Sequence, residues 1–432
     1  MAIPTSEERT DVGSYFIANY PPFSLWKPEH LPDALAALGR RPDSATPLGL
    51  YLHIPFCRKR CKFCYFRVVT DRNSRDVERY MDALAAEVEM LSRAAVMASR
   101  PLRFVYFGGG TPSFPSEKQL LGLVEKLRKV VSWDGAEEVT FECEPGTLTE
   151  RKLHAIREMG VTRLSLGVEN FSDAILEENG RAHHAPEVFR AYGWARGAGF
   201  DQVNIDLIAG MVGETPENWR DCVRKAIDLS PDAVTIYQME LPWNAVYAKS
   251  IGGIQVADWR TKREWVDHAF RELEAVGYHV SSAYTLVKDP SARFVYRDCL
   301  WRGADLAGAG VASFSHVGGV HFQNVDGFEE YIERVEAGDL PVNRALAPTR
   351  HQLLIRELIL QLKLGHVDPG YFLAKFGADI RVEFAGAFRS LEESGYLEPG
   401  EGEVRLTREG LLRVDSLLPL FFEPEHRGAR YT

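Results

Sequence analysis

The chain has 432 residues, of which 45% are hydrophobic and 26% are charged. These fractions are ordinary for a folded globular protein and exclude a disordered, collagen-like or coiled-coil chain. Its 51 Lys and Arg residues stand against 61 Asp and Glu residues, a net charge of −10, which argues against a partner such as nucleic acid or an anionic membrane surface.

Residues 1–47 are expected to form an irregular arm that carries no chemistry of its own. Its seven prolines include Pro21, Pro22, Pro28, Pro32, Pro42 and Pro47, which are interspersed with aromatic residues. Its acidic start lacks the basic and apolar regions of a secretory signal, and no apolar run in the chain approaches the roughly 18 residues that cross a bilayer. The sequence therefore predicts a cytoplasmic protein with no membrane contact.

From residue 48 to residue 239, runs rich in β-branched and aromatic residues alternate with amphipathic helical stretches. The expected strands are 48–54, 103–107, 138–142, 163–168, 202–208 and 233–239, and the expected helices are 75–91, 117–131, 149–159, 185–198 and 216–229. This alternation predicts βα units around a parallel sheet. We therefore expect an α/β fold with a partial (β/α)6 barrel over residues 48–245, and a doubly wound sheet is the alternative.

Two regions follow the expected barrel. Residues 246–348 are interpreted as a barrel extension that faces the substrate. From residue 349 the pattern changes to helices, followed by a short hairpin around Gly400 and Gly402 and a last helix. Residues 349–432 are therefore predicted to form a small winged-helix-like domain.

Three of the six cysteines crowd directly behind the first expected strand. Cys57, Cys61 and Cys64 have the spacing C-x3-C-x2-C, whereas the other cysteines are isolated. A structural zinc site needs four ligands, and His53 is the one nearby candidate for the fourth. Three thiolates on a 4Fe-4S cluster leave one iron open to a further ligand. The spacing and its aromatic flanks favour the cluster over zinc.

Further motifs follow in chain order. They read LYLHIPFC (50–57), YFGGGTPS (106–113), ECEPGTLT (142–149), RLSLGVENF (163–171), GRAH (180–183) and VNIDLIAGMVGET (203–215). With the cysteine spacing, they resemble the radical S-adenosylmethionine (SAM) enzymes, and within them the oxygen-independent coproporphyrinogen III oxidase family. The resemblance implies a partial barrel in which SAM chelates the open iron and one electron cleaves SAM to a 5′-deoxyadenosyl radical.

The same resemblance implies which residues bind the cofactor. Metal ligands are Cys57, Cys61 and Cys64. Residues expected to contact SAM are Tyr51, Phe63, Gly109, Gly110, Thr111, Glu142, Glu169, Arg181 and Asp206. Glu169 departs from the family, which commonly has Gln there, and a carboxylate accepts hydrogen bonds but donates none.

Two other departures bear on the reaction. Phe66 stands where the coproporphyrinogen oxidases carry an additional cysteine, and the stretch FVYRDCLWRG (294–303) lacks the His and Asn of the family's haem-binding motif. We therefore favour the class C pattern, in which a second SAM molecule gives a methyl or methylene group to an sp2 carbon. The alternatives are oxidative decarboxylation of coproporphyrinogen III or other tetrapyrrole chemistry, a non-catalytic haem carrier, and a zinc-binding structural protein.

The substrate is expected to be a small, planar, unsaturated molecule. Aromatic residues that follow the sixth strand, among them Tyr237, Tyr284 and Tyr296, are candidates for stacking on it. We predict Glu142, Tyr296 and His316 as catalytic residues. A histidine is suited to moving a proton because an imidazole titrates near neutral pH. His316 and His321 are regarded as loop histidines. An electron donor such as flavodoxin or ferredoxin, no nucleic acid, and a monomeric state complete the expectations.

Overall fold

Strand β1 (Leu48–Ile54) lies near the centre of a sheet of twelve strands in the computed structural model. The structure describes residues 10, 12–13, 16–41, 45–250, 254, 256–400 and 402–428. The strands have the order β12-β11-β10-β9-β1-β2-β3-β4-β5-β6-β8-β7. Six of them run parallel in chain order: β1, β2 (Leu102–Gly109), β3 (Glu138–Cys143), β4 (Arg163–Glu169), β5 (Gln202–Ala209) and β6 (Ala233–Gln238).

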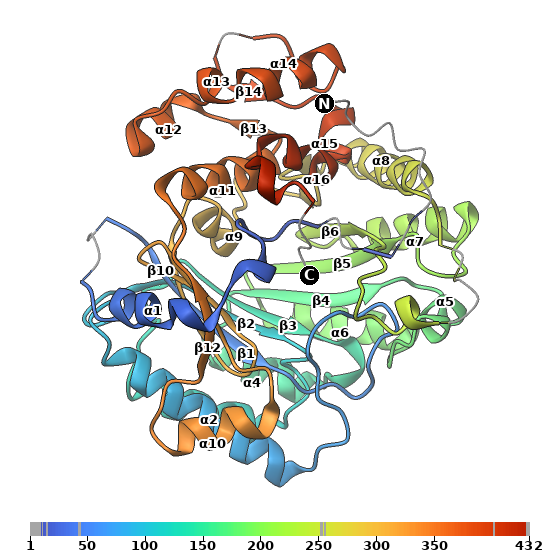
Figure 1. Ribbon diagram of the computed structural model, residues 1–432. Coiled ribbons are helices and arrows are strands. Elements are labelled where there is room, and N and C mark those ends of the chain that lie inside the picture. Colours follow the sequence, from blue (N-terminus) through green and yellow to red (C-terminus); the bar gives the residue numbers. More distant parts are fainter. Residues whose placement is uncertain are drawn as a thin grey trace.

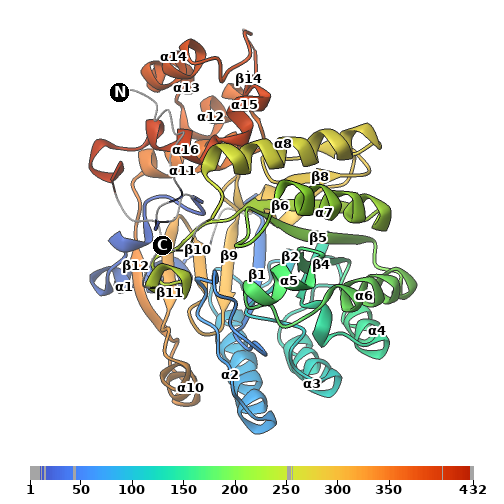
Figure 2. The ribbon, with the colours of Figure 1, turned by 90° about the vertical axis from the view of Figure 1, so that its right-hand side faces the viewer.

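The helices that connect these strands cover the outer face of the sheet (Figures 1 and 2). They are α2 (Ser74–Ser92), α3 (Glu117–Arg128), α4 (Glu150–Glu158), α5 (Asp173–Glu178), α6 (Ala185–Ala198) and α7 (Pro216–Leu229). Capping residues set their starts: Asn73 accepts hydrogen bonds from the first turn of α2, and Ser116 does so for α3. All the predicted strands and helices are present, with small shifts at their ends.

The strand order decides between the two predicted sheets. A doubly wound sheet reverses its strand order at a switch point, whereas β1 to β6 follow one another without reversal. The α/β fold with a partial barrel is thus confirmed, and the doubly wound alternative is wrong.

The two faces of the parallel strands differ in polarity. Residues such as Leu50, Leu52 and Phe107 are fully buried in the main hydrophobic cluster together with the outer helices. The opposite, inner face of β3 to β6 carries Glu138, Thr140, Glu142, Arg163, Ser165, Asn204, Asp206 and Thr235. Apolar side chains usually fill the inside of a (β/α)8 barrel. A polar inner face is costly unless its groups form hydrogen bonds with one another or with a ligand.

Six further strands extend the sheet on both sides. On one edge, β9 (Asp305–Ala309) runs parallel to β1, and β10 (Phe314–Val317), β11 (Val320–Asn324) and β12 (Val342–Leu346) follow in antiparallel order. On the other edge, β8 (Thr285–Val287) and β7 (His279–Val280) are antiparallel to β6 and to each other. Three helices connect these strands: α8 (Trp259–Ala275), α9 (Val295–Leu300) and α10 (Phe328–Glu336).

The arm is more regular than predicted. It contains α1 (Leu31–Leu38), which packs against β11 and β12, and the 3-10 turns Phe23–Leu25 and Pro28–His30. Ile17 and Tyr20 pack in a second hydrophobic cluster with the C-terminal helices. The buried Lys363 holds this part of the arm, because its ammonium donates to the Ile17 carbonyl over 2.7 Å.

The C-terminal region is mostly helical, and Figure 1 shows it above the sheet. It comprises α11 (Arg350–Leu362), α12 (Pro369–Phe376), α13 (Ile380–Glu383), α14 (Ala385–Glu393), α15 (Arg408–Leu412) and α16 (Val414–Leu417). Strand β13 (His366–Val367) pairs with β14 (Val404–Arg405), and a bridge between Leu397 and Leu406 lies where the hairpin was expected. The single last helix that was predicted is two short ones. The division of the chain into four domains stays a prediction.

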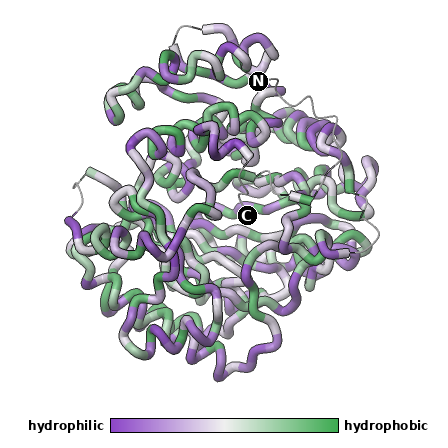
Figure 3. The backbone as a smooth tube through the Cα atoms, viewed as in Figure 1, coloured by the Kyte–Doolittle hydropathy of each residue, from purple (hydrophilic) through white to green (hydrophobic). Residues whose placement is uncertain are grey.

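Hydrophobic and hydrophilic residues are mixed along the whole backbone (Figure 3). Within the described residues, no helix is both long enough and apolar enough to span a bilayer.

Candidate active site

Cys57, Cys61 and Cys64 lie on the loop that follows β1 at its carboxyl end. Backbone hydrogen bonds close the loop, since Cys57 N–H donates to the Val69 carbonyl over 3.0 Å and Val69 N–H donates back to Pro55 over 2.8 Å. The Arg60 guanidinium donates to the Cys64 carbonyl inside the loop over 3.2 Å. Each of the three thiols is half-buried and free of disulfides.

The surroundings of the three thiols suit a metal cluster. Burial, together with the charge on Cys61, raises the pKa of Cys57 to about 11 and that of Cys64 to about 12. Because iron displaces the thiol protons, the bound form needs positive or hydrogen-bonding neighbours. Thr111 Oγ1 lies 3.3 Å from Cys57 Sγ, and an Arg181 nitrogen donates to Cys61 Sγ over 3.4 Å. The donor set therefore fits a 4Fe-4S cluster held by three thiolates.

His53 does not complete a zinc site. Its Nδ1 lies 3.2 Å from the Tyr51 hydroxyl, and its Nε2 is buried without a hydrogen-bond partner. Burial lowers the pKa of His53 to about 4, so the ring is neutral. The ring packs against Gly109, which places it behind the glycine turn.

The glycine turn after β2 is pressed against the cysteine loop. Gly109 has a φ of +121°. A Cβ on Gly109 would lie 2.8 Å from the His53 ring, and one on Gly110 would lie 2.5 Å from the Pro55 carbonyl oxygen. The glycines are required for this protein contact.

Three carboxylates gather on the inner face at the carboxyl ends of β3, β4 and β5. Glu142 accepts hydrogen bonds from the Tyr106 hydroxyl at 2.6 Å and from Gly109 N–H at 3.2 Å. Asp206 accepts from Ser165 and Asn204, both at 2.9 Å. Glu169 lies 3.6 Å from Arg181 and has a φ of +64°, at a register shift in the pairing of β4 with β5.

These carboxylates are poised to receive a cation. Burial is the main cause that raises the pKa of Glu142 and of Glu169 to about 7, and it also raises the pKa of Asp206. Each group also feels the charge of another, so the three share one site. A bound ammonium or sulfonium group would offset this repulsion, and Arg181 offers a guanidinium to a ligand carboxylate.

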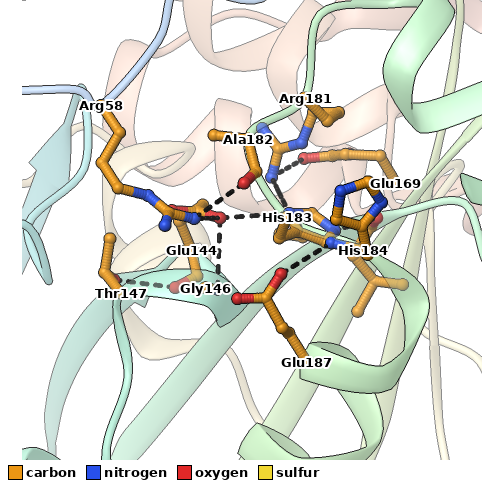
Figure 4. Close-up of polar contacts among 12 residues, drawn as sticks. Arg58, Glu144, Gly146, Thr147, Glu169, Arg181, Ala182, His183, His184 and Glu187 are labelled. Carbon is orange, nitrogen blue, oxygen red and sulfur yellow. Dashed lines mark hydrogen bonds and ion pairs between the residues drawn. The ribbon is translucent and has the colours of Figure 1, made fainter.

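A second network fixes the cysteine loop to the barrel and was missed by sequence reasoning. Figure 4 shows Glu144 between Arg58 and His183. The Arg58 guanidinium donates to both Glu144 oxygens, at 2.9 and 3.2 Å, and to the Ala182 carbonyl at 2.9 Å. His183 Nδ1 lies 3.3 Å from Glu144 and its Nε2 lies 3.2 Å from the Val168 carbonyl. Two sequence motifs contain residues of this network, ECEPGTLT with Glu144 and GRAH with His183, but neither motif indicated that the two residues are in contact.

An aromatic wall adjoins the carboxylates. The Tyr106 ring lies 5.9 Å from Tyr51 and 4.3 Å from Tyr296. Since Tyr106 also binds Glu142, the structure brings the predicted residues Tyr51, Tyr296 and Glu142 together. A second aromatic group lies on the inner side of β6, where Tyr237 is 40% exposed and stacks on Tyr284 at 6.1 Å.

His316 lies away from these groups. It is on β10, opposite Leu306, and Leu306 is level with Gly49 near the start of β1. The thiols follow the other end of β1. His316 Nδ1 lies 2.9 Å from His321 Nδ1, and both rings are buried. The two residues are therefore paired strand residues and not loop residues, because the turn of this hairpin is formed by Gly318 and Gly319 alone.

Phe63, predicted to contact the cofactor, packs on the apolar cluster that includes Ile175, Ile208 and Met211. This contact anchors the middle of the cysteine loop.

Known proteins resemble this chain in sequence and in fold. Residues 51–226 match the model of the Radical SAM superfamily. The heme chaperone HemW of Bacillus subtilis is 28% identical over 375 residues, which cover 86% of this chain and 98% of that protein. The oxygen-independent coproporphyrinogen III oxidase of Escherichia coli is 26% identical over 403 residues, covering 90% and 87%.

A solved structure, that of coproporphyrinogen III oxidase (HemN) from Escherichia coli, titled a radical SAM enzyme, has a TM-score of 0.83 at 24% identity. It covers 96% of this chain and 99% of its own, and it establishes the shared fold. The expected resemblance to the radical SAM, coproporphyrinogen oxidase-like proteins is confirmed.

Proposed function

We propose, from the premise that this chain is a radical SAM enzyme of the coproporphyrinogen oxidase-like family, that it starts radical chemistry on a planar, unsaturated, tetrapyrrole-type substrate. One observation carries the proposal. The three thiols, the Arg181 guanidinium and the three carboxylates meet at the carboxyl ends of β1 to β5. Catalytic groups of barrel enzymes gather at this end.

The chain's own residues would hold and orient the cofactors. Cys57, Cys61 and Cys64 would bind a 4Fe-4S cluster, and Arg181, between Cys61 and Glu169, would pair with the carboxylate of SAM. Glu142 and Asp206 would face its cationic side. When bound, the cluster and SAM supply a 5′-deoxyadenosyl radical that abstracts hydrogen.

The hydrogen bonds around Asp206 keep it in place without a ligand. Asn204 donates to Ser165 and to Asp206, and accepts a hydrogen bond from the Thr235 hydroxyl at 2.9 Å. Because a preorganised acceptor loses little conformational freedom on binding, this network favours affinity for a cationic ligand.

The substrate class rests on two kinds of support. The relatives are named for coproporphyrinogen III and for heme, and the aromatic wall of Tyr51, Tyr106 and Tyr296 offers flat surfaces for stacking. Oxidative decarboxylation or another tetrapyrrole reaction is the first candidate.

Methyl or methylene transfer from a second SAM molecule to an sp2 carbon is the second candidate, favoured by Phe66 in the place of a cysteine. A haem carrier that uses His316 and His321 as axial ligands is not favoured. Both nitrogens of His321 already face His316 and the Tyr20 carbonyl, and Trp26 stacks on its ring at 5.2 Å.

An anaerobic assay distinguishes these functions. The reconstituted protein is reduced and mixed with SAM and coproporphyrinogen III, and 5′-deoxyadenosine, S-adenosylhomocysteine and carbon dioxide are measured. Deoxyadenosine with carbon dioxide is expected for decarboxylation, and deoxyadenosine with S-adenosylhomocysteine for methyl transfer. The Cys61→Ala variant is the control. No deoxyadenosine from a protein with an intact cluster would refute the proposal.

Three further parts of the proposal concern the setting. A cytoplasmic location would suit thiolate ligands, which need reducing surroundings. The protein is proposed to act as a monomer, with a flavodoxin or a ferredoxin as its source of electrons.

A further inference from the structure

The outer side of the cysteine loop is strongly basic in a chain whose net charge is −10. Residues 58–67 contain five basic residues and no acidic ones: Arg58, Lys59, Arg60, Lys62 and Arg67. Arg58, Lys59, Arg60 and Arg67 are exposed. The positive charge is therefore concentrated where the predicted metal ligands lie.

Part of this charge is balanced inside the protein and part is not. Arg58 pairs with Glu144, Lys62 with Glu178 and Arg67 with Asp326. Arg60 instead donates to the neutral carbonyls of Cys64 and Asn244. Within the described part of the chain, no carboxylate lies within ion-pair distance of Lys59. Two positive charges thus face solvent between the first two cysteines.

Exposed apolar side chains lie beside these charges. Phe66 is 45% exposed, Trp243 50% and Val246 43%. They belong to one surface, because Asn244 donates to the Tyr65 carbonyl at 2.7 Å while Arg60 donates to Asn244. A centre of apolar residues next to charges of one sign is typical of a transient protein interface.

We propose that Lys59, Arg60, Phe66, Trp243 and Val246 form the docking surface for a small acidic one-electron carrier protein. This inference rests on the proposed function, since a bound 4Fe-4S cluster must be reduced before SAM is cleaved. Charge complementarity selects the partner: an acidic carrier would be attracted to this patch and repelled by the rest of an acidic protein.

The location makes the transfer direct. Phe66 is two residues from Cys64, and Lys59 and Arg60 lie between Cys57 and Cys61. A carrier seated here is separated from the thiolates by the thickness of one loop. The transfer balances: the reduced carrier loses one electron, the oxidised cluster gains it, and no atom moves between them.

The test uses the holoprotein with its cluster and flavodoxin hydroquinone as the probe. Lys59→Glu reverses one exposed charge without removing a hydrogen bond. The matched control is Arg190→Glu, an identical change of charge at an exposed position on α6. Stopped-flow absorbance measures the reduction of the cluster at 50 mM and at 500 mM salt, and calorimetry measures the binding of oxidised flavodoxin.

We expect Lys59→Glu to slow reduction by flavodoxin roughly tenfold at 50 mM salt and to weaken flavodoxin binding by a similar factor. At 500 mM salt the difference shrinks to less than about twofold, because salt screens the charges. Phe66→Ser weakens binding at both salt concentrations. Iron content and the rate of reduction by photoreduced deazaflavin, a small carrier that needs no docking surface, stay unchanged in both variants.

Three results would overturn the inference. The first is equal flavodoxin rates in Lys59→Glu and Arg190→Glu. The second is a loss that also appears with deazaflavin, which would mean that the cluster itself was altered. The third is binding of a DNA duplex instead of flavodoxin. A protein that assembles no cluster refutes the proposed function as well, whereas SAM cleavage with deazaflavin and no effect of Lys59→Glu refutes the docking surface alone.

Discussion

Replacement of Glu144 by Gln should release the cysteine loop from the barrel. Glu144 contacts both Arg58 on the loop and His183 behind β4. Burial alone would raise its pKa, but hydrogen bonding to His183 and the charges of Arg181 and Arg58 outweigh burial and lower the pKa to about 2. The ionised form is therefore strongly favoured in the folded protein.

The magnitude follows from this pKa. A shift from 4.5 to about 2 corresponds to about 3 kcal/mol of folding free energy at 1.36 kcal/mol per unit. Because the Arg58 side chain is 37% exposed, solvent weakens its share, and we expect a loss of about 2 kcal/mol for Glu144→Gln at pH 7. Because the pKa of Glu144 is lower in the folded protein, its ionised form contributes its full stabilisation above pH 4.5. This contribution decreases as the pH falls from 4.5 toward 2. Between pH 7 and pH 4 the difference from the parent should thus shrink by about 0.8 kcal/mol.

Urea unfolding of the metal-free protein at pH 7 and pH 4 measures this difference, and the rate at which a chelator removes iron from the reconstituted protein measures the hold on the loop. Glu178→Gln is the matched control, since Glu178 pairs with Lys62 of the same loop but is 52% exposed. The control should lose less than about 0.5 kcal/mol and keep its iron. If Glu144→Gln matched the control in both measurements, the network of Figure 4 would have no role in holding the loop.

Three other predictions concern the ligands, the carboxylates and the glycine turn. Cys61→Ala should lose the iron and the visible absorption of the cluster, whereas Cys299→Ala should keep both, as iron analysis and absorption spectra would show. SAM should bind up to about tenfold more tightly at pH 8 than at pH 6, because Glu142 and Glu169, each with a pKa of about 7, lose their protons over that range and attract a cation. Calorimetry should show that the affinity of Glu142→Gln for SAM depends less on pH. If its pH dependence equals that of the parent, Glu142 is not part of the cation site. Gly110→Ala should lower the melting temperature because its Cβ would lie 2.5 Å from the Pro55 oxygen, whereas Gly122→Ala, whose Cβ meets nothing within 4 Å in α3, should leave it equal or higher.

The parallel half of the sheet could be predicted because its strands are short runs rich in β-branched and aromatic residues between helical stretches, as β1 (LGLYLHI) and β5 (QVNIDLIA) show. Strand β9 could not. Its sequence is DLAGA, which has no β-branched or aromatic residue, yet all five residues are buried. The small residues are needed because a Cβ on Gly308 would lie 2.2 Å from the Phe314 carbonyl oxygen. Packing of the neighbouring strand thus overrides strand propensity.

The meeting of Glu142 and Asp206 could be predicted because both lie on parallel strands of the sheet, Glu142 near the carboxyl end of β3 and Asp206 within β5. The Glu144 network could not be predicted because its members are far apart in the sequence. Arg58 is 86 positions from Glu144 and 124 positions from Ala182. The placement of His316 and His321 in a loop was wrong for a related reason. Gly318 and Gly319 between them indicated a loop, whereas the cross-strand pairing of His316 with His321 is a property of the folded hairpin.

The two sides of the cysteine loop carry charges of opposite sign. Inside, Glu142, Glu169 and Asp206 lie together, and burial raises the pKa of each carboxyl group. Outside, Lys59 and Arg60 present positive charge to an anionic partner. The three cysteines proposed as cluster ligands lie between the negative inner side and the positive outer side. Positive charge on the outer side also stabilises an added electron, so the effect of Lys59→Glu on reduction by flavodoxin should be tested against its reduction by deazaflavin, which is expected to stay unchanged, and should disappear at high salt. A potential shift alone would not depend on the carrier, and this difference separates a docking role from an electrostatic one.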